Sequence, residues 1–187
     1  MILLAITPGF GFDRGRWAEV LRAGVDGFLI REKQMEARAL LDAAAWCQDT
    51  APHVALWVAG RLDVAFAAGC GLHAPEAHPD VDPDLVPLSR PLHEEGQWTA
   101  RRDVDQLLVS PIFPSPGKGA PWGMERLRRF LDGLPLEGPR LLALGGVDPS
   151  NAALLRHARL DGLAAIRPFS TRPPRRAVPS FPASAAG

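Results

Sequence analysis

The feature that most constrains the fold is a series of short apolar runs, each of strand length, that recurs along the chain. The runs are rich in Leu, Ile and Val, and most are separated by segments of helical periodicity. They lie at residues 2–7, 27–32, 53–59, 71–74, 85–90, 106–113, 140–146 and 162–169. Repeated strand and helix units form a parallel sheet that is covered on both faces, and eight such units close into a barrel. The sequence therefore predicts the α/β class, as a (β/α)8 TIM barrel.

The connecting segments predict that this barrel is trimmed. Outer helices are expected where apolar residues recur at spacings of three and four, at 17–24, 37–49, 62–69, 124–134 and 150–160. Prolines interrupt the fourth connection at 75–84, and the fifth, at 93–103, has room for about two turns. Prolines at 173, 174, 179 and 182 forbid a regular last helix. We predict one barrel domain over residues 1–169 and a Pro-rich C-terminal tail over 170–187.

Composition excludes several classes of partner. The chain has 187 residues, a length that suits one domain, and its 21 Lys and Arg balance its 21 Asp and Glu. No overall field favours nucleic acid or an anionic membrane. The apolar opening ends at Pro8 and lacks a basic segment, so it predicts neither a signal peptide nor a transmembrane span. Cys47 and Cys70 lack metal-site spacing and are expected to be reduced, which indicates a cytoplasmic protein.

The missing last helix also bears on assembly. Without that helix, apolar surface on the first and last strands would be exposed. Exposed strand faces and edges favour association with another subunit. We therefore predict a homodimer.

In such barrels the functional site lies at the carboxyl ends of the strands. The polar residues that close the predicted strands, or open the following loops, are mostly cations and hydrogen-bond donors. The strand ends also carry Thr7, His73, Arg90 and Ser110, and the residues proposed for the site are Arg31, Lys33, Arg61, Glu76, His93, Ser115, Lys118, Gly145, Gly146 and Arg167. This composition predicts a small anionic ligand such as a phosphate ester.

Gly145 and Gly146 are the clearest element of this site. Two glycines after a buried strand allow backbone amides to approach an oxyanion, and they tolerate the positive φ that such a loop needs. The alternative is a tight turn before a helix that begins with Asp148 and Pro149.

Four further cations have both a ligand role and a structural alternative. Because side chains alternate along a strand, we expect Arg31 and Lys33 to point one way and Glu32 the other, the alternative being an internal ion pair. Arg61 is either a ligand contact or a partner of Asp63. For Arg167 a phosphate contact is favoured, the alternative being solvation beside the tail.

Several motifs, taken together, resemble a known family. The segments at 28–33, 57–73, 89–93, 110–123 and 142–155, above all SPIFPSPGK and LALGGV, are similar to the thiamine phosphate synthase and TenI-like thiazole tautomerase family. The resemblance implies a TIM barrel that binds a small phosphate, with Ser115, Lys118, Gly145 and Gly146 at the phosphate and thiazole end.

The synthase branch implies magnesium chemistry, in which a thiazole phosphate attacks a pyrimidine pyrophosphate and Mg²⁺ neutralises the departing pyrophosphate. This chain has Ala59 and Gly60 in place of an Asn-Asp pair, and Ala77 or His78 in place of an acidic ligand. Leu29 replaces a glutamine on the pyrimidine side. We therefore expect no required cofactor, with Mg²⁺ needed only if the chain is a synthase.

These departures place the chain closer to the TenI-like branch, which moves a proton in a thiazole phosphate. Pro111 stands where a branch member has its catalytic histidine, so His93 or Glu76 would have to transfer the proton. His93 could instead be a structural residue bonded to a loop carbonyl. For His73, at the end of the fourth strand, a packed structural role is favoured.

Three functions remain open. The leading hypothesis is a TenI-like protein that binds a thiazole phosphate and aromatises it. The second is a non-catalytic paralogue that binds or carries such a phosphate. The third is a thiamine phosphate synthase with unfamiliar metal ligands, for which Asp80, Asp82 and Asp84 are candidates.

Overall fold

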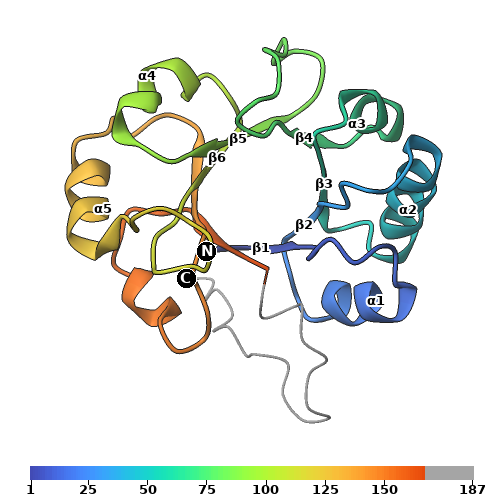
Figure 1. Cartoon of the computed structure of the whole chain (residues 1–187), viewed down its shortest axis with the longest axis horizontal. Helices are drawn as coiled ribbons and strands as arrows, with labels where there is room; N and C mark the ends of the chain where they lie inside the picture. Colours follow the sequence, from blue (N-terminus) through green and yellow to red (C-terminus); the bar gives the residue numbers. More distant parts are fainter. Residues whose placement is uncertain (167–187) are drawn as a thin grey trace.

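A computed structural model describes residues 1–166, in which eight parallel strands pair in sequence order and close into a barrel (Figure 1). The strands are β1 (Ile2–Ile6), β2 (Gly27–Ile30), β3 (Ala55–Ala59), β4 (Gly71–His73), β5 (Leu88–Leu92), β6 (Gln106–Val109), β7 (Arg140–Ala143) and β8 (Gly162–Ala165). β1 pairs with β8 in the register Ile2 to Gly162, which closes the sheet. The predicted (β/α)8 barrel is confirmed.

The fifth strand begins later than the predicted range of 85–90. β5 starts at Leu88, whose amide donates to the Asp105 carboxylate, and residues before Pro87 belong to the preceding turn. Only Leu88 and Ser89 pair with β4. Pro91 therefore lies beyond the end of β4, where its missing N–H removes no ladder bond on that side.

The helices lie outside the strands (Figure 1). They are α1 (Arg14–Arg22), α2 (Ala37–Thr50), α3 (Leu62–Ala68), the 3-10 helix η1 (Glu95–Gln97), α4 (Trp98–Arg101), α5 (Gly123–Asp132) and the 3-10 helix η2 (Ala152–Leu155). The Pro-broken segment 75–84 contains no helix, and η1 with α4 supply the two turns expected at 93–103. No helix within residues 1–166 is both long and apolar enough to cross a membrane.

The helix predicted over 150–160 is wrong in its extent, because only the four residues of η2 are helical there. Local side-chain bonds compete with a regular helix at this point. The Asp148 carboxylate accepts from the Ser150 amide at 2.8 Å, and the Asn151 side chain donates to the Gly146 carbonyl at 2.7 Å. The predicted tail at 170–187, and Arg167, lie outside the described residues.

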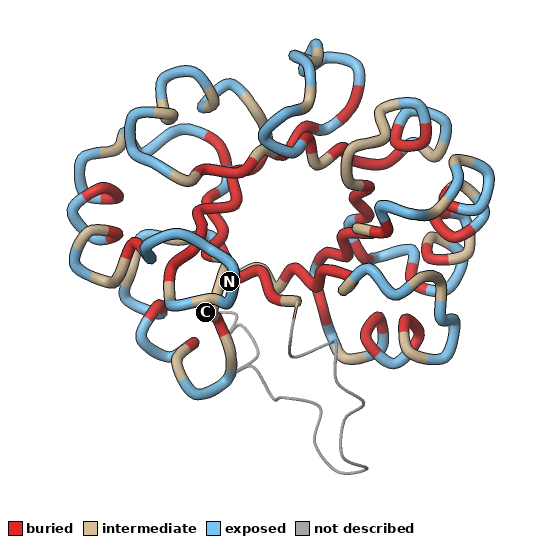
Figure 2. The backbone as a smooth tube through the Cα atoms, in the orientation of Figure 1, coloured by how far each residue is buried: buried red, intermediate tan, exposed pale blue. Residues whose placement is uncertain are grey.

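The buried side chains form layers inside and outside the barrel wall, and Figure 2 shows the strands as an almost continuous buried ring. The interior cluster contains Leu4, Ile6, Leu29, Trp57, Leu108, Leu142 and Ala164. Two outer clusters pack the strands against the helices. The interior is filled by large side chains, and Gly71 leaves the space that the Trp57 ring occupies.

Candidate active site

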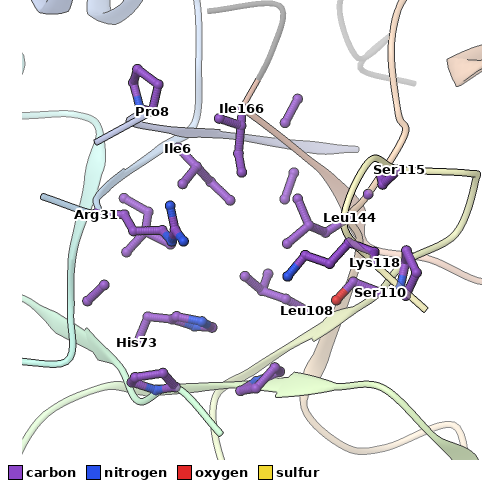
Figure 3. A pocket seen from close by; sticks show the side chains of 18 of the residues that line it. Ile6, Pro8, Arg31, His73, Leu108, Ser110, Ser115, Lys118, Leu144 and Ile166 are labelled. Carbon is purple, nitrogen blue, oxygen red and sulfur yellow. The ribbon is translucent and has the colours of Figure 1, made fainter. Parts of the chain in front are cut away.

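A cavity of about 1030 Å³ opens at the carboxyl ends of the strands, and residues from the ends of all eight strands line it. Its floor is apolar, with Ile6, Leu108, Leu144 and Ile166 directed into it (Figure 3). The predicted site residues that the structure describes all line this one cavity. They are Arg31, Lys33, Arg61, Glu76, His93, Ser115, Lys118, Gly145 and Gly146.

Two cations enter the cavity from opposite walls. Arg31 extends from the end of β2 and Lys118 from the loop after β6, and both point toward the centre (Figure 3). The Arg31 amide donates to the Thr7 hydroxyl at 2.8 Å, and the Lys118 amide donates to the Ser115 carbonyl at 3.2 Å, which fixes the backbone under each side chain. Within residues 1–166 neither charged group has a hydrogen-bond or ion-pair partner.

Glu32 anchors the loop between β1 and α1. Its side chain is only 5% exposed, and its carboxylate accepts from the Gly9 amide at 3.1 Å and from the Gly11 amide at 2.7 Å. The alternative of an internal ion pair with Arg31 or Lys33 is therefore wrong. This carboxylate instead holds the loop that places Pro8 in the cavity wall.

His93 is held in one tautomer. Its Nδ1 lies 2.9 Å from the Ser110 carbonyl oxygen, which can only accept, so Nδ1 carries the proton and donates. Nε2 carries the lone pair in the neutral ring and lies 3.8 Å from a Glu76 carboxylate oxygen. His93 therefore makes the carbonyl bond of the structural alternative and also directs Nε2 toward Glu76 at the cavity, and its side chain is 37% exposed.

Glu76 is held by two residues that no motif in the sequence pointed to. Arg101 of α4 donates to both of its carboxylate oxygens, at 2.9 Å for the Nη1 contact, and the Gln97 amide donates to it at 3.2 Å. The Arg101 guanidinium also donates to the Pro91 carbonyl, so it is fixed on both sides. The hydrogen bonds from Arg101 lower the pKa of Glu76 below its usual range. An ionised carboxylate of low pKa is a poor general base.

His73, at the end of β4, lines the cavity, and its ring is also bonded to the neighbouring strand (Figure 3). Its Nδ1 lies 3.0 Å from the Ser89 hydroxyl, which is also 3.3 Å from the side-chain amide of the buried Gln106. Burial, and then the charges of Arg31 and His93, lower the pKa of His73 to about 4. The ring is therefore neutral at neutral pH.

Arg61 lies at the cavity rim but is committed to its own helix. Its guanidinium makes two bonds to the Asp63 carboxylate, at 2.9 and 2.7 Å, at the start of α3. The hydrogen bond from Arg61 lowers the pKa of Asp63. Of the two roles open to Arg61, the partnership with Asp63 is the one present here.

Gly145 and Gly146 both have the expected positive φ, but among residues 1–166 the helix expected to begin at Asp148 and Pro149 is absent, and η2 begins only at Ala152. The φ values of the two glycines are 91° and 67°, and a Cβ on Gly146 would lie 2.7 Å from the Cβ of Phe113. Glycine is thus required for packing against the loop after β6. Their amide N–H groups have no acceptor among residues 1–166, so they are also available to an anion.

The residues present do not fit a carboxylate-held magnesium ion. Glu32, Glu76 and Asp148 are the carboxylates that line the cavity, and each already accepts hydrogen bonds from protein donors. Residues 1–166 contain no cluster of three metal-ligating side chains. Of the alternative acidic ligands, Asp80 pairs with Arg90 at 3.2 Å outside the cavity lining.

Comparison with known proteins identifies relatives of the chain. A family model described as thiamine monophosphate synthase matches residues 15–169. The thiamine-phosphate synthase of Albidiferax ferrireducens is 34% identical over 182 residues, which cover 88% of this chain and 82% of that protein. The thiamine-phosphate synthase of Chloroflexus aurantiacus is 28% identical, with 87% and 82% covered.

Solved structures agree on the fold. Thiamine phosphate pyrophosphorylase from Pyrococcus furiosus superimposes with a TM-score of 0.78 at 18% identity, covering 91% of this chain and 88% of that one. The corresponding protein from Bacteroides thetaiotaomicron gives 0.71 at 16% identity, with 96% and 91% covered. At these identities the similarity establishes the barrel alone. The named sequence relatives favour the synthase alternative over the TenI-like branch.

Proposed function

Because the chain belongs to the thiamine monophosphate synthase family, we propose that it acts in thiamine biosynthesis and that its cavity binds a thiazole phosphate. One observation carries this proposal. An apolar floor suited to a small ring lies beneath two cations without partners in residues 1–166, Arg31 and Lys118, and beside the free amides of Gly145 and Gly146. Apolar pockets with a few convergent polar groups are typical small-ligand sites.

The phosphate is proposed to bind at the Gly145 and Gly146 amides, with Lys118 closing over it. The loop after β6 packs directly against both glycines, so Ser115 and Lys118 lie on the segment nearest to the free amides. Prolines 114 and 116 limit the freedom of this loop and so reduce the entropy lost when it orders over a ligand. Arg167 follows β8 and is proposed as a further contact.

The first candidate reaction is the synthesis of thiamine phosphate, which is the activity named for the relatives. A thiazole nitrogen would attack the methylene carbon of the pyrimidine partner, and the bond to the departing diphosphate would break. The cavity has room for both reactants at about 1030 Å³. Arg31 and Lys118 would stabilise the negative charge that the leaving group acquires.

The second candidate is proton transfer in the bound thiazole, and the geometry of His93 favours it. Its tautomer leaves Nε2 able to accept a proton, and the ionised Glu76 at 3.8 Å would stabilise the imidazolium that forms. Glu76 is therefore proposed as a partner of His93 and not as the base itself. Arg101 keeps that carboxylate charged and in place.

Calorimetric titration with carboxythiazole phosphate tests the ligand class. Binding is expected without added metal, and Lys118→Ala should raise Kd about tenfold through the loss of one charge-assisted contact. Arg128→Ala removes an exposed arginine of α5 that lies outside the cavity, so it should leave Kd unchanged. An unchanged Kd in Lys118→Ala would exclude Lys118 from the site.

Two assays separate the candidate reactions. Formation of thiamine phosphate from the thiazole phosphate and the pyrimidine diphosphate identifies a synthase. Incorporation of solvent deuterium into the thiazole identifies proton transfer, and His93→Gln should abolish it while ligand binding persists. Binding without either reaction would identify the non-catalytic paralogue.

The predicted cytoplasmic location and homodimer remain proposals, which fractionation and analytical ultracentrifugation would test.

A further inference from the structure

We infer that this cavity binds a diphosphate group through side-chain cations and without a divalent metal ion. The inference rests on the proposed function, because it specifies how the more highly charged reactant would be held. Two observations on the cavity lining support it. The carboxylates already accept hydrogen bonds from protein donors, whereas several cations have no such partner within residues 1–166.

The cavity carboxylates are committed to structural bonds. A metal bound to Glu32 would compete with the Gly9 and Gly11 amides and release the loop between β1 and α1. A metal bound to Glu76 would meet Arg101, whose guanidinium occupies both carboxylate oxygens and is itself only 12% exposed. Mg²⁺ prefers protein carboxylates that are free to coordinate it together with phosphate oxygens.

The wall at β3 offers no replacement ligand. Ala59 and Gly60 line the cavity there without side-chain oxygens, and the next residue, Arg61, brings a positive charge. The nearby Asp63 carboxylate is held by Arg61 through both of its oxygens. Residues 167–187 include four arginines and no acidic side chain, so they cannot supply the missing carboxylates.

The cations, in contrast, are available. Arg31, Lys33 and Lys118 all line the cavity, and none of their charged groups has a partner within residues 1–166. Arg31 and Lys118 face one another across the opening (Figure 3). A diphosphate placed between them would receive donors from both sides, whereas a divalent cation in the same place would be repelled by both.

The lowered pKa of His73 is consistent with positive charge in the cavity. Arg31 and His73 line the same cavity, and the charge of Arg31 contributes, after burial, to the lowered pKa of His73. Arg31, Lys33 and Lys118 therefore bring positive charge to the place where a diphosphate would bind.

The test is calorimetric titration of the full chain with inorganic diphosphate, first in EDTA and then in excess Mg²⁺. Saturable binding is expected in EDTA, with no tightening in Mg²⁺. Arg31→Met and Lys118→Met should each weaken binding about tenfold. Arg128→Met, which removes an exposed cation of α5, is the matched control and should bind like the unmodified chain. Lys118 lies in an exposed loop, so its variant remains informative if Arg31→Met does not fold.

Three results would overturn the inference: diphosphate binding only with Mg²⁺, tightening by tenfold or more on its addition, or no binding in either buffer. The parallel titration with carboxythiazole phosphate distinguishes this failure from that of the proposed function. If the thiazole phosphate binds while diphosphate requires Mg²⁺, the inference alone fails. If diphosphate binds in EDTA while the thiazole phosphate does not bind, the proposed ligand fails and metal-free diphosphate binding stands.

Discussion

Replacing Glu32 with glutamine should reveal how strongly one buried carboxylate stabilises the cavity wall. The side chain is 5% exposed, and its two oxygens accept from the Gly9 and Gly11 amides at 3.1 and 2.7 Å. Glutamine has nearly the same shape but only one acceptor oxygen. In Glu32→Gln one amide would keep a neutral hydrogen bond, and the other would face an NH₂ donor.

The expected loss of stability follows from these two bonds. A hydrogen bond to a charged group contributes about 1.5–3 kcal/mol, and a buried donor left without an acceptor costs about 1–3 kcal/mol. Because one bond persists in weaker form, we expect the free energy of unfolding to fall by about 2–4 kcal/mol. That is a large part of the roughly 5–15 kcal/mol typical of a domain. Urea unfolding followed by circular dichroism measures it, and faster proteolysis near residues 9–12 should accompany it.

Glu36→Gln is the matched control for this experiment. Glu36 precedes α2, is exposed, and makes no side-chain bond to the helix. Its replacement should change the free energy of unfolding by no more than about 0.5 kcal/mol. If Glu32→Gln changed the free energy of unfolding by as little as Glu36→Gln does, the two amide bonds would not hold the loop. The role assigned to Glu32 would then be wrong.

The remaining predictions concern the barrel and its titration. Gly146→Ala should cost about 2–4 kcal/mol in urea unfolding, because a Cβ at φ 67° would lie 2.7 Å from that of Phe113; a loss below about 1 kcal/mol would contradict this. Gly71→Ala should destabilise by forcing the Trp57 ring to move, and Trp57→Leu should relieve part of that loss; strict additivity in the double-mutant cycle would refute the contact. Burial lowers the pKa of His73 to about 4, below its ordinary value near 6.5, so the unfolded chain binds the extra proton more readily. Stability should therefore fall as pH drops from about 6.5 to about 4, and His73→Gln should flatten that slope; an unchanged slope in urea unfolding across this range would exclude the assignment.

Local pattern was sufficient for most of the barrel. Apolar runs such as 2–7, 27–32 and 140–146 each contain a strand, because a strand covered on both faces must be apolar along its length. The predicted bounds of the fifth strand were wrong, because apolar composition alone does not show where strand pairing begins. β5 begins at Leu88, after Pro87, where the Leu88 amide donates to the Asp105 carboxylate. Similarly, periodicity alone could not show that local side-chain bonds would shorten the helix expected at 150–160.

The sequence by itself determined which residues reach the cavity, because a parallel barrel brings all the strand carboxyl ends to one opening. Arg31, Lys118 and the two glycines follow from that rule alone. Only the tertiary structure decided what each of them contacts. Glu76 accepts a hydrogen bond from Arg101, which is 25 residues away in the sequence, and Glu32 accepts one from the amide of Gly9, which is 23 residues away. Hydrophobic periodicity is a short-range property of the chain, whereas partners for buried charges come from whichever loops the closed barrel brings together, and no spacing in the sequence encodes that choice.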